Sequence, residues 1–200
     1  MIDVPTIFDA YESFTNEAYA VDYSNHPIAG HSNFEIHYIE PNDLVFFEGV
    51  EKKIPSFKLC THKRDISFWG VNFEKNKAYF GKSRQCECMF TPITGGKPFV
   101  LLLEMKYCLP KNAYVNELEA FAQLKDTLKI LEDNGTIDHK THKVYLNISL
   151  PWSNDEPFNS FRSTQDDAIS VLENDGIQVL GHNSLLIFTE SHIKPPRIEV

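Results

Sequence analysis

The chain has 200 residues and a formal net charge of −9, with 42% hydrophobic and 12% aromatic residues. This size and composition predict one globular domain with a sizeable core, and they exclude a disordered chain. No apolar run approaches the length of a membrane span, and the acidic start MIDVPTIFDAYES lacks the layout of a signal peptide. Because four cysteines occur without a secretion signal, we expect reduced thiols in a cytoplasmic protein that has no membrane partner.

Positive charge collects in one part of the sequence. Between Lys52 and Lys111, 12 Lys and Arg residues stand against 4 Asp and Glu, which leaves 7 cationic and 24 acidic residues elsewhere. A local positive field of this kind attracts a phosphate backbone. Lysines also commonly solvate strand edges, so the sequence leaves both interpretations open.

The first third of the chain gives mixed signals. Apolar and aromatic residues recur at helical spacing over residues 6–21, which predicts an N-terminal helix. Residues 33–47 alternate well enough for two short strands around a turn, and residues 49–65 are basic and predicted to be irregular. Short strand-like runs follow at 67–71 and 77–80.

A β-hairpin is predicted in the middle of the chain. Two apolar arms flank a Thr-Gly-Gly turn within residues 93–97, and the second arm is rich in Val and Leu, as in a strand buried on both faces. That arm ends in Glu104-Met105-Lys106, where alternation places the two charged side chains on one face. Glu87 on the first arm can approach Glu104 if the arms pair. Buried charges need partners, and two carboxylates beside a lysine suit a hard divalent cation, although a structural ion pair is the plainer alternative.

The second half of the chain predicts helices that pack on a sheet. A helix is expected over 116–134, with Asn116 as its cap, Gly135 after its end and an apolar stripe from Phe121 to Leu131. The fold class is therefore α/β, a single domain with a central mixed β-sheet flanked by helices. The other predicted elements are a half-buried strand over 143–150, a helix over 163–175, and short strands over 177–180 and 185–189.

This arrangement resembles the PD-(D/E)xK nuclease superfamily, whose fold is also called restriction-endonuclease-like. In that family an acid on one strand precedes, across a hairpin, an acid-x-Lys on the next strand, which is followed by a helix and another strand. The resemblance makes residues 76–190 a nuclease-like core and residues 1–75 an N-terminal helix and elaboration. The chain departs from the family pattern because its first acid is Glu87 rather than Asp, and no Pro-Asp pair precedes that acid.

The resemblance implies a metal-dependent nuclease that hydrolyses phosphodiester bonds of DNA or RNA. Glu87 and Glu104 would hold Mg²⁺ or Mn²⁺, with the backbone carbonyl of Met105 completing the ligand set. Lys106 would orient the attacking water or the scissile phosphate, and it would accept a proton if burial lowers its pKa. Many nucleases of this type pair to cut two strands, so the resemblance is also compatible with a homodimer.

The resemblance adds further candidate residues. Gln123 lies on the predicted helix where some family members carry a Gln followed four residues later by Tyr, which here is Thr127. Glu17 would come from the predicted N-terminal helix, and Asp65 is the alternative first acid. Contacts to the nucleic-acid backbone are expected from Lys82, Arg84 and Lys97.

Two hypotheses from other classes compete with the nuclease. A non-catalytic protein-interaction module that retains a nuclease-like scaffold is favoured by the overall acidity and by a Glu at the first-acid position. A small-molecule-binding domain would instead show a deep apolar pocket remote from Glu104.

Overall fold

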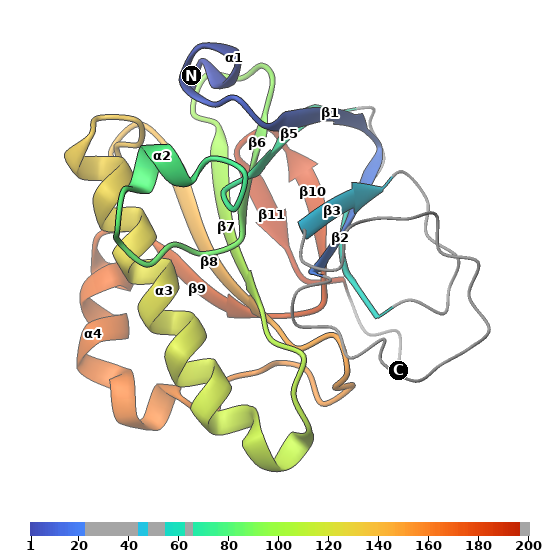
Figure 1. The fold of residues 1–200 in the computed structure, drawn as a ribbon, viewed down its shortest axis with the longest axis vertical. Helices are drawn as coiled ribbons and strands as arrows, with labels where there is room; N and C mark the ends of the chain where they lie inside the picture. Colours follow the sequence, from blue (N-terminus) through green and yellow to red (C-terminus); the bar gives the residue numbers. More distant parts are fainter. Residues whose placement is uncertain (23–43, 48–54, 63–65, 197–200) are drawn as a thin grey trace.

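Two β-sheets pack face to face, and two helices cover the outer face of the larger sheet (Figure 1). The computed structural model describes residues 1–22, 44–47, 55–62 and 66–196. These elements form one α/β domain, as predicted, but with two mixed sheets instead of one.

The larger sheet has the strand order β1-β5-β6-β7-β8-β9. Its neighbours are antiparallel from β1 to β7 and parallel from β7 to β9, so the predicted hairpin is present as the β6–β7 pair. The strands are β1 (Tyr11–Thr15), β5 (Ser67–Asn72), β6 (Cys88–Pro92), β7 (Phe99–Met105), β8 (Lys143–Ser149) and β9 (Gln178–Gly181).

The smaller sheet has the order β11-β10-β4-β2-β3 and is also mixed, because β10 runs parallel to β4 while the other neighbours are antiparallel. It covers the face of the larger sheet that the helices leave free. Its strands are β2 (Glu17–Asp22), β3 (Leu44–Phe47), β4 (Phe57–Thr61), β10 (Ser184–Thr189) and β11 (His192–Lys194).

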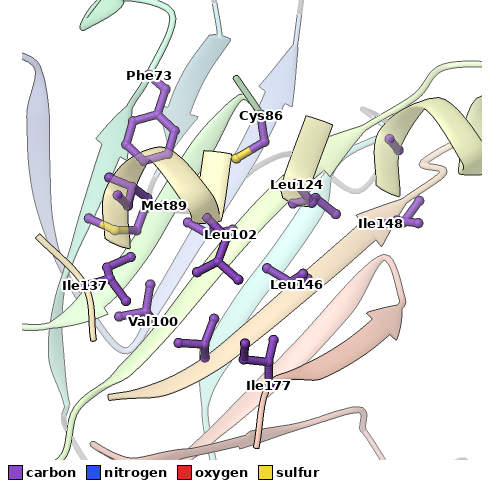
Figure 2. Packing of buried hydrophobic residues seen from close by; sticks show 14 of the residues in the cluster. Phe73, Cys86, Met89, Val100, Leu102, Leu124, Ile137, Leu146, Ile148 and Ile177 are labelled. Carbon is purple, nitrogen blue, oxygen red and sulfur yellow. The ribbon is translucent and has the colours of Figure 1, made fainter. Parts of the chain in front are cut away.

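The central strand β7 is buried along its whole length because its two faces contribute to two different cores. Val100 and Leu102 pack with Leu124 and Leu146 on the helix side, as Figure 2 shows. Residues of the opposite parity, such as Leu101, face the smaller sheet. The same arrangement buries β8 on both faces, so the prediction of a half-buried strand there was wrong.

The helix after β7 is α3 (Ala113–Asp133), preceded by a 3₁₀ turn, η1 (Pro110–Asn112). The predicted apolar stripe is buried, and Gly135 follows the helix end with φ +70°, a backbone conformation that favours glycine. The predicted start at Asn116 was wrong by three residues. The Asn116 side chain instead donates a hydrogen bond to the Asn112 carbonyl, 2.8 Å away, from within the first turn.

The N-terminal helix predicted over residues 6–21 does not form. The only helix there is the single turn α1 (Val4–Ile7), followed by β1 and β2 in different sheets. Asn16, with φ +77°, makes the turn that passes the chain from one sheet to the other, and Asn tolerates this conformation. Pairing with β5 and β4 therefore outweighs the helix-like spacing of the aromatic residues.

Two further local predictions were wrong for the same reason. Residues 77–80 form the one-turn helix α2 (Lys77–Phe80) instead of a strand, and Phe80 is buried against Phe73 with ring centroids 4.7 Å apart. Strand β4 lies in the stretch predicted to be irregular, where Phe57 and Leu59 fill the core between the sheets. Long-range packing decides the structure of both segments.

A buried carboxylate joins α3 to the second helix on that face, α4 (Arg162–Asn174). Glu117 accepts hydrogen bonds from the Ser160 hydroxyl at 2.7 Å and from the Phe161 amide at 3.2 Å. We expect Glu117→Ala to lower the free energy of unfolding by about 1–3 kcal/mol, because these buried donors lose a charged acceptor.

Urea unfolding at pH 7 tests this prediction. The matched control is Asp133→Ala, which removes an exposed acid paired with Lys129 at 2.8 Å and should change the free energy of unfolding much less, because exposed ion pairs contribute little. Equal losses in the two variants would contradict the role assigned to Glu117.

Candidate active site

The carboxylate of Glu104 lies at the end of β7 and is paired with Lys106. Glu104 is 1% exposed, and its Oε1 lies 2.9 Å from the Lys106 Nζ. The Lys106 amide donates to the Ser149 carbonyl at 2.9 Å, so the pairing of β7 with β8 continues past the strand end. This continuation fixes the backbone on which both charged groups stand.

Gln123 of α3 holds the other side of the Lys106 ammonium. Its Oε1 accepts a hydrogen bond from Lys106 Nζ at 2.8 Å, and its Nε2 donates to the Gln85 carbonyl at 3.3 Å. Glu119 is the second acid near this ammonium, at 4.0 Å. The structure therefore brings Gln123 to Glu104 and Lys106.

Thr127 occupies the position four residues after Gln123, where some PD-(D/E)xK proteins have Tyr. Its hydroxyl donates to the Gln123 carbonyl at 2.8 Å and accepts a hydrogen bond from the Cys86 amide at 2.6 Å. The side chain is fully buried. Thr127 thus fixes the backbone immediately before Glu87 to the helix that carries Gln123.

Glu87 lies just before β6, beside Glu104. Its amide donates to the Leu103 carbonyl at 3.2 Å, and its carbonyl accepts a hydrogen bond from the Phe73 amide at 2.9 Å. Glu87 is 6% exposed, and its Oε2, like the Oε2 of Glu104, is buried without a hydrogen-bond partner among the described residues. Such buried, unsatisfied carboxylate oxygens are costly and call for a ligand or a proton.

A third acid, Asp22, reaches this cluster from the smaller sheet. Asp22 is the last residue of β2 and is fully buried. Its side chain forms a hydrogen bond with Glu87, and its backbone amide donates a hydrogen bond to the Tyr107 hydroxyl at 3.3 Å. Sequence analysis did not identify Asp22, because β2 was assigned to a helix. The available signal was alternation, since Ala18 and Ala20 occupy the inward positions that precede it.

The environment shifts the pKa of Glu87, Glu104 and Lys106. Burial, then the charges of Glu104 and Asp22, raise the pKa of Glu87 well above its usual range. Burial also raises the pKa of Glu104 to about 7, although the Lys106 ammonium acts in the opposite direction. Burial alone would lower the pKa of Lys106, but the Glu104 carboxylate outweighs it and the net shift is upward. Lys106 is therefore a stable cation, which does not suit the role of proton acceptor.

Three of the other sequence candidates lie away from this cluster or outside the described residues. Lys97 is at the turn end of β7, about 20 Å along the strand from Glu104, and its Nζ donates to the Lys140 carbonyl. Glu17 begins β2, at the opposite end from Asp22, and forms a surface ion pair at 3.2 Å. Asp65 lies outside the described residues.

The remaining two candidates are exposed cations that precede Glu87. Lys82 follows α2, and Arg84 lies 3.5 Å from Asp126 of α3 in an exposed ion pair. They lie in the same segment as Gln85, whose carbonyl Gln123 contacts. The structure therefore places them nearer to the carboxylates than Lys97.

The described residues contain no group of three or more His, Cys, Asp or Glu side chains already arranged to hold a metal ion. A hollow of about 230 Å³ lies between β1 and β3, and Asn72 is among its lining residues. Its lining mixes acidic, cationic and aromatic side chains, among them Glu12, Lys75 and Phe46, and so differs from a deep apolar ligand pocket.

Comparisons with known proteins found no matching family model, no matching curated protein and no matching solved structure. None of the helices in the described part of the chain is both long and apolar enough to span a membrane.

Proposed function

We propose that this protein is a divalent-cation-dependent nuclease that hydrolyses phosphodiester bonds. The observation that carries the proposal is the convergence of Glu87 and Glu104 beside Lys106, where one buried oxygen on each carboxylate has no hydrogen-bond partner among the residues that the structure describes. The strand arrangement supports it, because the acid Glu87 directly before β6, the β6–β7 hairpin with its acid-x-Lys, the helix α3 and the parallel strand β8 follow one another. This is the order that characterises the PD-(D/E)xK core.

The donor set fits a hard cation. Glu87 and Glu104 would hold Mg²⁺ or Mn²⁺ through their oxygens, with the Met105 carbonyl as a further oxygen donor. A bound ion supplies positive charge beside the scissile phosphate and lowers the pKa of a nearby water. Asp22 holds Glu87 in place through a hydrogen bond that needs one shared proton, and a bound cation would replace that proton.

Lys106 contributes a fixed positive charge. Gln123 and Glu104 orient its ammonium, which can donate a hydrogen bond to a non-bridging phosphate oxygen and stabilise charge that develops in the transition state. Because its pKa is raised, Lys106 keeps this charge throughout the physiological pH range. Its role in the proposed reaction is electrostatic.

A cleavage assay tests the proposal. Labelled single-stranded and duplex DNA and RNA are incubated with the wild-type protein in Mg²⁺, in Mn²⁺ or in EDTA, and we expect cleavage of at least one substrate in a divalent cation and none in EDTA. Glu87→Gln should lose this activity, whereas Glu17→Gln should keep it because Glu17 lies at the far end of β2. If wild-type protein cleaves no substrate in either metal, the nuclease proposal fails and the non-catalytic interaction module becomes the better interpretation.

A further inference from the structure

A short segment beside the candidate active site carries concentrated positive charge. Residues 74–85, here called the α2 segment, contain four exposed cations and the single acid Glu74. The chain as a whole has a net charge of −9, so the α2 segment is positively charged although the protein is acidic. The exposed cations are Lys75, Lys77, Lys82 and Arg84.

The α2 segment is a fixed platform rather than a loose loop. Phe80 is buried against Phe73, and the Asn76 side chain accepts a hydrogen bond from the Asp9 amide at 2.8 Å and donates to the Ala10 carbonyl at 3.0 Å. A hydrogen bond between the Tyr79 and Thr136 hydroxyls ties the segment to the turn after α3. These anchors hold its inner side, so its cations are presented to solvent.

This platform leads directly into the candidate active site. Gln85, the last residue of the segment, accepts a hydrogen bond from the same Gln123 side chain that holds Lys106. Among the described residues, Arg84 forms an exposed ion pair with Asp126 at 3.5 Å, and such pairs are weak enough to be exchanged for a phosphate. A phosphate at Arg84, the residue next to Gln85, would therefore neighbour the phosphate at Lys106.

The surface beyond Lys106, on the side of α4, carries the opposite charge. Glu119 of α3 lies 4.0 Å from Lys106. The start of α4 is attached to the start of α3 by a hydrogen bond between Tyr114 and Thr164, and it exposes Asp166 and Asp167. A nucleic acid that crosses the site would meet cations on one side and carboxylates on the other.

We propose that the α2 segment binds the sugar-phosphate backbone of a single nucleic-acid strand on one side of the scissile phosphate, so that the preferred substrate is a single strand or the single-stranded end of a duplex. A long duplex continues past the site and would meet the acidic α4 side. This inference rests on the proposed function for the position of the scissile phosphate, whereas the binding surface itself is tested without cleavage.

Fluorescence anisotropy measures the dissociation constant of labelled 20-nucleotide single strands and 20-base-pair duplexes in EDTA at several KCl concentrations. Lys77, Lys82 and Arg84 should give a slope of log K against log[KCl] of about −2 for single strands, since each neutralised phosphate contributes about −0.7. Lys75 is not counted, because it acts on the nearby Glu12 carboxylate. We expect the wild type to bind the single strand more tightly than the duplex.

The variant Lys77→Gln/Lys82→Gln/Arg84→Gln should make the slope less steep by about 2 and weaken binding at low salt by at least about tenfold. The matched control, Lys97→Gln/Lys140→Gln/Lys143→Gln, removes the same charge from the far end of β7 and β8 and should leave the slope unchanged. Thermal unfolding checks that both variants are folded.

Three outcomes would overturn the inference: equal weakening in the two triple variants, tighter binding of the duplex, or no binding by the wild type. The proposed function fails separately. If the wild type binds as expected but never cleaves, the nuclease proposal is wrong and the binding surface stands. If the wild type cleaves but the first triple variant keeps the wild-type slope of log K against log[KCl], only the proposed binding surface is wrong.

Discussion

In metal-free protein, the free energy of unfolding is expected to fall by about 3 kcal/mol as the pH rises from about 5 to 8. The Glu104 carboxyl has a pKa of about 7 in the folded protein against 4.5 for an unperturbed Glu, so between these values the folded state binds a proton that the unfolded state has released. Its stabilising contribution is complete below the lower pKa and is lost as the pH passes the higher one. Glu87 acts in the same direction because its pKa is also raised.

Urea unfolding in EDTA at several pH values measures this dependence. Glu104→Gln should reduce the slope, because a neutral amide replaces the titrating group. Glu119→Gln should preserve it, because Glu119 is an exposed acid, although it lies 4.0 Å from Lys106. A slope that is the same in Glu104→Gln and wild type would show that Glu104 titrates normally. It would thereby contradict the burial argument.

A divalent cation should restore the stability that the metal-free protein loses at high pH. An ion bound only by the folded protein stabilises it by about 2.7 kcal/mol at a concentration 100 times its dissociation constant. The gain should increase as the pH rises through the Glu104 pKa of about 7, because the cation then competes less with a bound proton, and it should be absent from Glu104→Gln. This readout does not require catalysis, so it separates cation binding from nuclease activity.

The central part of the fold was predictable because its signals are local. The Val- and Leu-rich arm of β7, the Thr-Gly-Gly turn and the apolar stripe of α3 each arise within about 20 consecutive residues. Alternation also placed Glu104 and Lys106 on one face of the strand, where the structure pairs them at 2.9 Å. Their roles in catalysis stay predictions.

The second sheet could not be predicted in the same way. Strand β2 pairs with β3 and β4, and β4 pairs in parallel with β10, which comes from the far end of the chain. No local pattern encodes such pairings. Because the N-terminal strands were predicted to be a helix, neither the core between the sheets nor the position of Asp22 was predicted.

Asp22 is the site residue that was missed because β2 was predicted to be helical. It lies 65 residues before Glu87 in sequence yet shares a hydrogen bond with it. An acid at the inward position after Ala18 and Ala20 is the same kind of signal that identified Glu104 at the end of β7. Applied to residues 17–22 as a strand, it would have identified the third acid.

Lys106→Met is expected to cause the largest loss of cleavage activity while the cation site stays intact. The substitution keeps much of the side-chain length but removes the ammonium, so neither Glu87 nor Glu104 is altered and the cation ligands remain. We expect kcat for phosphodiester cleavage to fall by about 10²–10³-fold, the range typical of removing one fixed electrostatic donor, with a much smaller change in the Mg²⁺ concentration that gives half-maximal rate. Single-turnover cleavage over a Mg²⁺ titration gives both quantities.

The control Lys111→Met removes an exposed cation five residues further along the chain and should leave kcat within about twofold of wild type, because solvent and salt screen an exposed charge. Lys106→Arg keeps the charge but changes its geometry, and should recover only part of the rate because Gln123 holds a compact ammonium at 2.8 Å. If Lys106→Met instead shifts the Mg²⁺ requirement at unchanged kcat, the ammonium acts on the cation site and not on the reacting phosphate. A role for Lys106 in transition-state stabilisation would then be wrong, while the carboxylate pair would keep its proposed function.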